Sequence, residues 1–491
     1  MKAPFLAAGL LAAGAGALAI GRAAQCKCFS GDACWPPASA WNSLNETVGG
    51  RLIATVPLAE ACHDHNYDPA RCQALRDFLL AFFAICTHSS NSLCASQPRA
   101  TAGALSAWTH KLNSIEFKEW KGGDYTGSAV KLGGGVQAFQ VLSAVLEKKQ
   151  AVVGGECPTV GLAGGYNQGG GHSALSTSFG LSADNTLEFE VVTAASELVT
   201  ASRTQNAETF KTFPDAVVCG ATLAFYADDN PAAIFYGAID AFHAALPDMV
   251  SAGAMVVYYF TSSFFQRAPL TAYNKTAAEV EAMLSPFAAK LTAMGVKYTL
   301  EYSQSATYYD HYDKYFGPLS VGNIEVGIVQ YGGRLVPLSA FANCPTAMSA
   351  VTRYIADKGV TWICVGTDVS RFGKNGSNAV LPASRTPLVH ATLTTPWSFD
   401  PAEWDQILAN QRLTTDDIIP RIKAVTPGSG AYMDEADFQQ PNFQQAFFGS
   451  NYQSLLCVKQ KYDPEGFFWA TKAVGSEKWT VANDGRICQA S

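Results

Sequence analysis

A glycine-rich segment between Gly154 and Ser173 restricts the fold of this chain more than any other feature. Eight of its twenty residues are glycine. Such a loop lets the backbone approach a flat or phosphorylated ligand, and its unshielded N–H groups can bind anionic oxygens. The segment lacks both the Gly-x-Gly-x-x-Gly spacing of dinucleotide sites and the spacing of a Walker loop. Composition alone therefore leaves two interpretations open, a ligand-binding loop and a flexible surface loop.

The overall composition excludes several classes of protein. The chain has 491 residues, 48% of them hydrophobic, which predicts two or three globular domains. A formal charge of −7 without a run of lysines and arginines argues against binding to nucleic acid or to an anionic membrane. His63-Asp64-His65 has no partner cluster at metal-ligand spacing, so we expect a polar loop and no metal site. The class of partner that the composition leaves open is a small molecule.

The first residues have the pattern of a secretory signal. Ala3 to Ile20 is an uninterrupted apolar run, with Ala17-Leu18-Ala19 as a cleavage candidate. A permanent membrane anchor is the alternative, because the run approaches the length of a spanning helix. No later segment is comparably long and apolar, so we expect residues 1–24 to be removed and the mature protein to be secreted and soluble.

Cysteines and glycosylation sequons favour the same compartment. Asn45, Asn274 and Asn375 each begin an Asn-x-Ser/Thr sequon. The thirteen cysteines fit an oxidising environment, and their odd number leaves at least one outside an intramolecular disulfide. Five of them crowd the N-terminal region and predict a disulfide framework, with metal binding as the alternative: Cys26, Cys28, Cys34, Cys62 and Cys72.

Hydrophobic periodicity predicts a mixed α+β architecture. A strand at 128–132, a helix starting near Val136 and a strand at 151–153 indicate a βαβ unit, and 187–200 indicates a hairpin with its turn at Ala195-Ser196. Further strands are predicted at 255–260, 324–331 and 390–395 as parts of an antiparallel sheet. Helices are predicted after the capping box at Thr276, after Asp400-Pro401, and over the aromatic run at 308–315, as a packed helix.

Two separate stretches resemble one family. Gly155 to Ser173, followed by Phe179 to Asn185 and Glu190 to Thr193, resembles the flavin-binding core of secreted fungal FAD-linked oxidases, the berberine-bridge-like members of the vanillyl-alcohol-oxidase family. Residues 431–437 and 451–469 resemble the berberine-bridge segment of the same family. The resemblance implies a PCMH-type two-lobed FAD-binding domain over 25–211, a substrate domain with an antiparallel sheet flanked by helices over 212–430, and a C-terminal segment over 431–491 that returns to the flavin.

The resemblance also implies roles for individual residues. Cys157 matches the cysteine that attaches the flavin covalently in some members, with a disulfide or buried thiol as the alternative. Tyr432, Asp434 and Glu435 would lie on a strand facing the substrate and supply the catalytic base, unless Glu435 is only a solvated charge. The other implied FAD-binding residues are Pro158, Thr159, Val160, Gly161, Gly164, Gly165, Gly169, Gly170, His172, Leu181, Asp184, Val191, Asn451 and Tyr452. For His172 a hydrogen-bonded neighbour, and for Asn451-Tyr452 a helix start with a packed tyrosine, are the alternatives.

Two blocks of the family pattern are missing. Between Phe78 and Cys94 there is no Gly-His-Asp, so the second covalent histidine is not found, and His88 does not replace it. After Asn206 the flavin-lining polyglycine stretch is also absent. Either the gene model is mis-spliced or the chain is a paralogue without oxidase activity. The leading hypothesis is an FAD-dependent oxidase that transfers a hydride from an alcohol, sugar or secondary metabolite to FAD, reoxidised by O2. The alternative is an inactive binding protein on the same fold.

Overall fold

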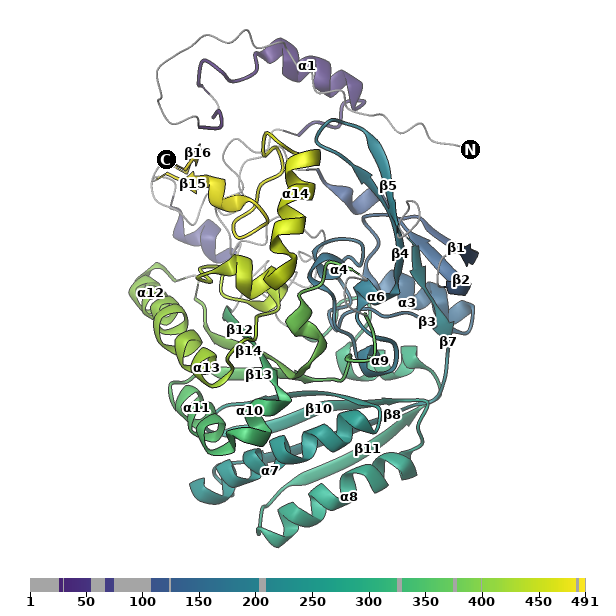
Figure 1. Cartoon of the computed structure of the whole chain (residues 1–491), viewed down its shortest axis with the longest axis vertical. Coiled ribbons are helices and arrows are strands. Elements are labelled where there is room, and N and C mark those ends of the chain that lie inside the picture. Colours follow the sequence, from purple (N-terminus) through teal and green to yellow (C-terminus); the bar gives the residue numbers. More distant parts are fainter. Residues whose placement is uncertain are drawn as a thin grey trace.

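The computed structural model describes residues 26–29, 31–53, 67–74, 107–122, 125–202, 209–324, 329–373, 378–398, 400–482 and 485–490. Within them, two antiparallel sheets of five and seven strands form the framework, and helices cover parts of both (Figure 1). The C-terminal segment lies beside the smaller sheet and above the larger one in that view. The predicted α+β class is therefore confirmed.

The smaller sheet is built from residues 115–211. Its strands, in spatial order, are β1 (Ile115–Gly122), β2 (Tyr125–Leu132), β6 (Thr209–Lys211), β4 (Thr186–Val192) and β5 (Leu198–Ser202). The predicted hairpin is confirmed, because β4 and β5 pair around a turn in which Ser196 has a φ of 61°. Helix α3 (Ala138–Glu147) buries Val141, Leu142 and Val145 in one core with side chains from β2 and β6.

The predicted βαβ unit is wrong. After α3 the chain forms β3 (Gln150–Ala151), which pairs antiparallel with β7 (Phe213–Pro214) in a separate two-stranded sheet. β2 already has β1 on one side and β6 on the other, so no edge is left for a parallel third strand. Val152 and Val153 are buried outside any strand, and the glycine-rich segment follows directly.

The larger sheet is built from residues 218–396, and all its pairings are antiparallel. Its strands, in spatial order, are β11 (Thr299–Ser305), β8 (Val218–Tyr226), β10 (Phe264–Tyr273), β9 (Ala254–Phe260), β13 (Thr361–Gly366), β14 (Pro387–Pro396) and β12 (Val329–Pro337). One face packs against α7 (Ala232–Ser251), α8 (Ala277–Ala293), α10 (Leu338–Asn343), α11 (Pro345–Asp357) and α13 (Ile419–Val425). The other face shares a core with α3 and with α9 (Tyr308–Phe316).

Most predicted elements of this part are confirmed. The Thr276 hydroxyl accepts from the Glu279 N–H at the start of α8, as the capping box requires. Asp400 accepts from the Ala402 N–H, 2.9 Å away, before the short 3-10 helix Pro401–Glu403. The aromatic run forms the packed helix α9. The strand predicted at 324–331 is confirmed from Val329 on, whereas Ile324 is not in a strand and 325–328 lie outside the described residues.

The remaining elements are short or lie near the C-terminus. They are α1 (Ala38–Thr47), α4 (Gly165–Gly169), α5 (Ser176–Phe179), α6 (Ser182–Asn185), α12 (Trp404–Arg412), α14 (Tyr452–Tyr462), β15 (Trp479–Val481), β16 (Ile487–Gln489), 3-10 helices at Thr109–Lys111, Pro382–Arg385, Met433–Glu435, Gly449–Asn451 and Ser476–Lys478, and π-helices at Leu413–Ile418 and Gln444–Phe448.

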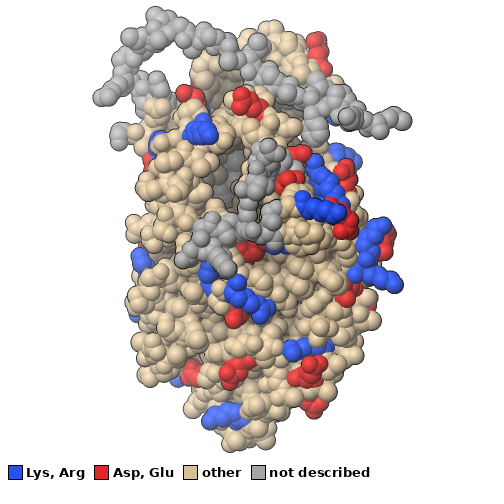
Figure 2. Space-filling model, turned by 45° about the vertical axis from the view of Figure 1, so that its right-hand side comes forward, with Lys and Arg blue, Asp and Glu red and all other residues tan. Residues whose placement is uncertain are grey.

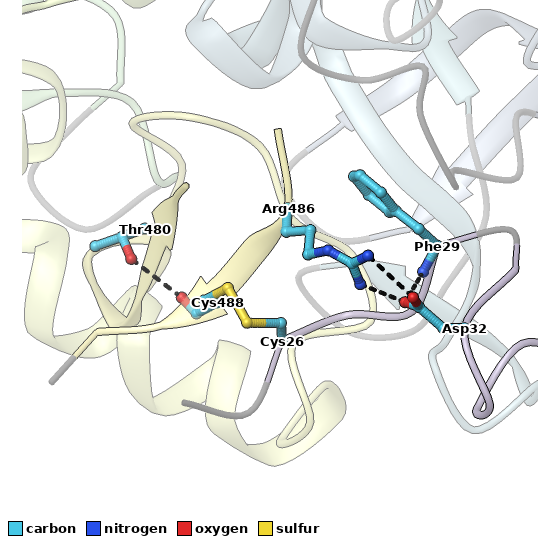
Figure 3. Close-up of a disulfide and its surroundings, with 6 residues drawn as sticks. All are labelled: Cys26, Phe29, Asp32, Thr480, Arg486 and Cys488. Atoms are coloured by element: carbon cyan, nitrogen blue, oxygen red, sulfur yellow. Dashed lines mark hydrogen bonds and ion pairs between the residues drawn. A yellow bond between two sulfur atoms is a disulfide. The ribbon is translucent and has the colours of Figure 1, made fainter. Parts of the chain in front are cut away.

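Disulfides hold the N-terminal segment in place. Cys26 bonds to Cys488 on β16, and beside this bridge both guanidinium nitrogens of Arg486 donate to the Asp32 carboxylate (Figure 3). Cys28 bonds to Cys34, and Cys72 is also disulfide-bonded. Free thiols among the described residues are those of Cys157, Cys219, Cys344, Cys364 and Cys457.

Several sequence features lie outside the described residues, namely the signal segment, His63-Asp64-His65, the stretch from Phe78 to Cys94, and the sequon at Asn375. No helix in the described ranges is both long and apolar enough to cross a bilayer. On the face shown in Figure 2, lysines and arginines are interspersed with acidic side chains.

Candidate active site

The glycine-rich segment is held by two helices. The Tyr312 hydroxyl on α9 donates to the Gly155 carbonyl, 2.7 Å away. At the start of α3, the N–H groups of Ala138 and Phe139 donate to the carbonyls of Val160 and Pro158, at 3.0 and 2.8 Å. These contacts use the first N–H groups of α3, so this helix N-terminus does not serve as an anion site.

Glycine is required here partly by the protein's own side chains. A Cβ at Gly169 would lie 2.2 Å from Oδ2 of Asp434, and one at Gly171, where φ is +72°, would lie 2.8 Å from the Tyr166 ring. The Tyr166 hydroxyl donates to the His172 carbonyl, 2.8 Å away. Asp434 and Tyr166 can therefore approach the backbone of the loop only because these positions lack side chains.

His172 joins the loop to the C-terminal segment. Its Nε2 lies 2.9 Å from Oε1 of Glu435, and its Nδ1 lies 3.6 Å from Oε1 of Glu156. Burial alone would lower the pKa of His172, but the two carboxylates outweigh it and raise the pKa well above its usual value. We infer that His172 is a buried imidazolium between two carboxylates.

Glu435 is fixed on both oxygens. Its Oε1 binds His172, and its Oε2 accepts from the Thr392 hydroxyl on β14, 2.7 Å away. A Cβ at Gly333 on β12 would lie 2.4 Å from the Glu435 carbonyl, so this glycine lets the turn lie against the sheet. Although burial would raise the pKa of Glu435, the charge and hydrogen bond of His172 and the bond from Thr392 lower it to about 2. Glu435 is therefore ionised, and the interpretation of a merely solvated charge is wrong.

Asp434 differs from its neighbour. It lies in the 3-10 helix Met433–Glu435 after the extended Tyr432, so the expected strand at this position is wrong. The Asp434 side chain is exposed, whereas desolvation raises its pKa to about 7, with the Glu435 charge adding to the rise and Tyr432 and His172 opposing it. We call the surface around Asp434, Glu435, His172 and Cys157 the recess. Tyr432 itself is buried, and burial and the two carboxylates raise its pKa well above the ordinary value.

Cys157 lies beside this group with a free, partly buried thiol. Burial, and then the carboxylates of Glu156 and Glu435, raise the pKa of the thiol to about 12. Cys157 is therefore not a disulfide partner, and its sulfur is protonated at neutral pH.

Sequence reasoning missed four residues of this group. Glu156, Tyr166 and Thr392 contact His172 or Glu435, and His390 on β14 lies next to them. The His390 ring centre is 5.8 Å from that of His172 and 6.0 Å from that of Tyr432. Glu156 and Tyr166 lie inside the glycine-rich segment and could have been noticed there, whereas the two β14 residues depend on strand register.

Other predicted site residues make contacts outside the group around His172 and Glu435. Asp184 is occupied by Arg385, whose Nη1 is 2.6 Å from Oδ2. Val191 is exposed on β4, and the Tyr452 hydroxyl binds Glu477, which supports a packed tyrosine at a helix start. The rest have structural contacts or backbone positions: Leu181 packs with Val369 and Val380, Asn451 donates to the Val380 carbonyl at 3.0 Å, the Thr159 carbonyl accepts from Gln137 at 2.8 Å, Gly161 bridges to Gln137, Gly164 and Gly165 begin α4, and Gly170 has a φ of +125°.

The donor set of the recess fits the ring end of a flavin. Gly155, Cys157 and Tyr166 are partly exposed on the loop side, and the buried atoms Glu156 Oε1 and His172 Nδ1 lie 3.6 Å apart as an ion pair, with no closer hydrogen-bond partner among the described residues. Such a loosely paired polar site suits a polar ligand or water. The segment from Gly154 to Ser173 has no lysine or arginine to bind a pyrophosphate, so we assign only the ring end to it.

Comparisons with known proteins agree with this geometry. A family model described as "Berberine and berberine like" matches residues 431–475. The FAD-linked oxidoreductase ZEB1 of Gibberella zeae is 43% identical over 545 residues, covering 95% of this chain and 96% of the relative. The VAO-type flavoprotein oxidase VAO615 of Thermothelomyces thermophilus is 31% identical, and the match covers 95% of this chain and 96% of that relative.

A solved structure is similar over the same extent. The crystal structure of the VAO-type flavoprotein MtVAO615 from Myceliophthora thermophila has a TM-score of 0.86 at 29% identity, covering 95% of this chain and all of that one. The alignment with ZEB1 spans 545 residues, more than the 491 of this chain, so segments of that relative have no counterpart here.

Proposed function

Because this chain belongs to the berberine-bridge-like FAD-linked oxidoreductases of the vanillyl-alcohol-oxidase family, we propose that it oxidises an alcohol, a sugar or a secondary metabolite and passes the electrons to O2. The substrate carbon would lose a hydride and its hydroxyl a proton, leaving a carbonyl, while O2 would leave as hydrogen peroxide. A bound FAD would supply the hydride acceptor.

One observation carries this proposal: the pKa values of two adjacent carboxyl groups are shifted in opposite directions. Glu435 is ionised and engaged on both oxygens by His172 and Thr392. Asp434 has an exposed carboxylate with a pKa of about 7, which desolvation raises and the hydrogen bond with Tyr432 opposes. A general base works best when its pKa lies near the working pH. We therefore assign removal of the substrate proton to Asp434. Glu435 and His172 would hold the turn in place through their ion pair.

We also propose that Cys157 attaches the flavin covalently. Its free thiol lies in the glycine-rich segment on the same side as His172 and Glu435. This assignment would account for one cysteine outside the disulfides. The alternative is a buried thiol without a function, because buried free cysteines also serve as small apolar side chains.

Secretion is a further part of the proposal. The Cys26–Cys488 and Cys28–Cys34 bridges fit an oxidising compartment. We assign residues 1–24 to a removed signal, 25–211 to FAD binding, 212–430 to the substrate domain, and 431–491 to the segment that completes the site.

An inactive binding protein on this fold is the second candidate, and the shortness of the chain relative to ZEB1 favours it. The visible spectrum of the secreted protein separates the two. Flavin absorption that stays with the acid-precipitated protein supports the oxidase and the Cys157 link, and a colourless protein refutes the oxidase. A Cys157→Ala variant that keeps acid-stable flavin would refute the link alone. Sequencing the transcript tests the mis-spliced gene model, which fails if the cDNA encodes residues 78–97 as written.

A further inference from the structure

His390 is buried without a hydrogen-bond partner. It is 3% exposed, and neither Nδ1 nor Nε2 contacts a donor or acceptor within the described part of the chain. Burial, and then the positive charge of His172, lower the pKa of His390 to about 3. The ring is therefore neutral at physiological pH, with one N–H donor and one acceptor nitrogen. Buried polar atoms of this kind are rarely left unpaired in a functional protein.

The register of the sheet places His390 beside the recess, on the sheet face that meets the turn carrying Glu435. On β14, His390 and Thr392 point to the same face, because side chains alternate along a strand. Thr392 donates to Glu435, so this face meets the catalytic turn. The residues directly opposite on β12 are Leu335 and Gly333, and on β13 they are Val365 and Ile363. The Tyr432 ring completes the surroundings of His390 at 6.0 Å.

The side of the recess that the sheet forms is uncharged. Strands β9, β13 and β14 contain no Asp, Glu, Lys or Arg, and β12 contains only Arg334. Arg334 is opposite Ala391, which belongs to the core on the helix-covered face, and its guanidinium donates to Thr426. Tyr259, Thr361 and Ile363 are half-buried on the recess face, and Tyr331 is exposed there. A sheet surface of aliphatic, aromatic and hydroxyl side chains favours an apolar ligand body over a polyhydroxylated or charged one.

We propose that His390 hydrogen-bonds the oxygen of a neutral, largely apolar alcohol, which is the substrate. This inference rests on the proposed oxidase function and narrows its substrate class. An alcohol can both donate to and accept from a neutral imidazole, whereas a carboxylate can only accept. The oxygen bound to His390 would also lie beside the turn that carries Asp434, the proton acceptor.

A tertiary alcohol tests this proposal without turnover. 2-Phenyl-2-propanol has no hydrogen on its carbinol carbon and cannot release a hydride. Its binding to the purified full chain is measured by calorimetry, beside cumene, which lacks the hydroxyl, methyl β-cellobioside and hexanoate. We expect the alcohol to bind about tenfold more tightly than each of the other three, as one good hydrogen bond allows. Equal binding of cumene, or preference for the sugar or the anion, would overturn the proposal.

Variants locate the effect. His390→Leu should weaken alcohol binding about tenfold, and His390→Gln should retain most of it. His243→Leu is the matched control, because His243 is another buried histidine with a pKa of about 3, bonded to Tyr258 on the helix-covered face. Unchanged alcohol binding in His390→Leu would overturn the proposal. If that variant does not fold, the comparison of alcohol with cumene in the wild type decides.

The visible spectrum of the same samples separates this inference from the proposed function. A yellow protein that binds the sugar more tightly than the alcohol would support the oxidase and refute the inference. A colourless protein with His390-dependent alcohol binding would refute the oxidase, and with it the role of the alcohol as substrate, while supporting the alcohol site at His390. A colourless protein without alcohol binding would refute both. A changed flavin spectrum in His390→Leu with unchanged alcohol affinity would make His390 a cofactor contact and overturn the inference.

Discussion

The rate of substrate oxidation should follow the ionisation of Asp434. Desolvation and the Glu435 charge raise the pKa of this carboxyl from its usual range to about 7. If Asp434 accepts the substrate proton, only its ionised form is active. About half of the molecules are then active at pH 7, about a tenth at pH 6 and about a hundredth at pH 5.

Anaerobic stopped-flow reduction of the flavin by 1-phenylethanol measures this step directly. The rate should rise about tenfold from pH 5 to pH 6 and about fivefold from pH 6 to pH 7, and then level off above about pH 8. Asp434→Asn should lower the plateau by about 10²- to 10⁴-fold and abolish the pH dependence. Tyr432→Phe should move the midpoint above pH 7, because Tyr432 lowers the pKa of Asp434.

Two results would refute this reasoning. A wild-type midpoint near pH 4 would mean that the active base is a carboxyl of ordinary pKa. If the Asp434→Asn variant kept the rise in rate between pH 5 and pH 7, another group would have to be the proton acceptor. Glu435 would then be the first alternative, in spite of its two hydrogen bonds.

Three further changes test the packing of the site. Gly333→Ala should lower the free energy of unfolding in urea by about 1–3 kcal/mol and should also lower kcat, because the new Cβ would lie 2.4 Å from the Glu435 carbonyl. Wild-type values of both quantities would contradict this close approach. Asp184→Asn should cost about 3 kcal/mol, because it leaves the Arg385 guanidinium without its carboxylate; urea unfolding at pH 7 measures it, and a loss below about 1 kcal/mol would show that the pair is solvated. In flavin-free protein at pH 8, Cys157 should react with iodoacetamide at least about tenfold more slowly than the exposed free cysteines, because its pKa of about 12 keeps the thiol protonated. Mass spectrometry measures the extent of alkylation at each cysteine, and equal rates would contradict the raised pKa.

Local signals predicted local structure well. The Thr276 capping box and the turn near Ser196 were found from sequence because a few neighbouring residues determine them. The strand expected after α3 failed for a nonlocal reason: the pairing of β2 with β1 and β6 left β3 to pair with β7.

The same distinction applies to the site. The resemblance pointed to Tyr432, Asp434 and Glu435, and these residues do meet the loop at His172. It could not show that the pKa values of Asp434 and Glu435 are shifted in opposite directions, because the low pKa of Glu435 depends on Thr392 and His172, which are distant in sequence. His390 was missed because a single histidine in an alternating strand carries no signal until the register shows which face it occupies.

The bridge between Cys26 and Cys488 closes 462 residues of chain into one covalent ring. A force applied to handles on the two sides of this bridge would run through the two sulfur atoms and bypass both sheets. In optical tweezers the oxidised protein should therefore extend only by its tails, and the unfolding of the sheets should appear as a lengthening event only after a reductant has opened the ring.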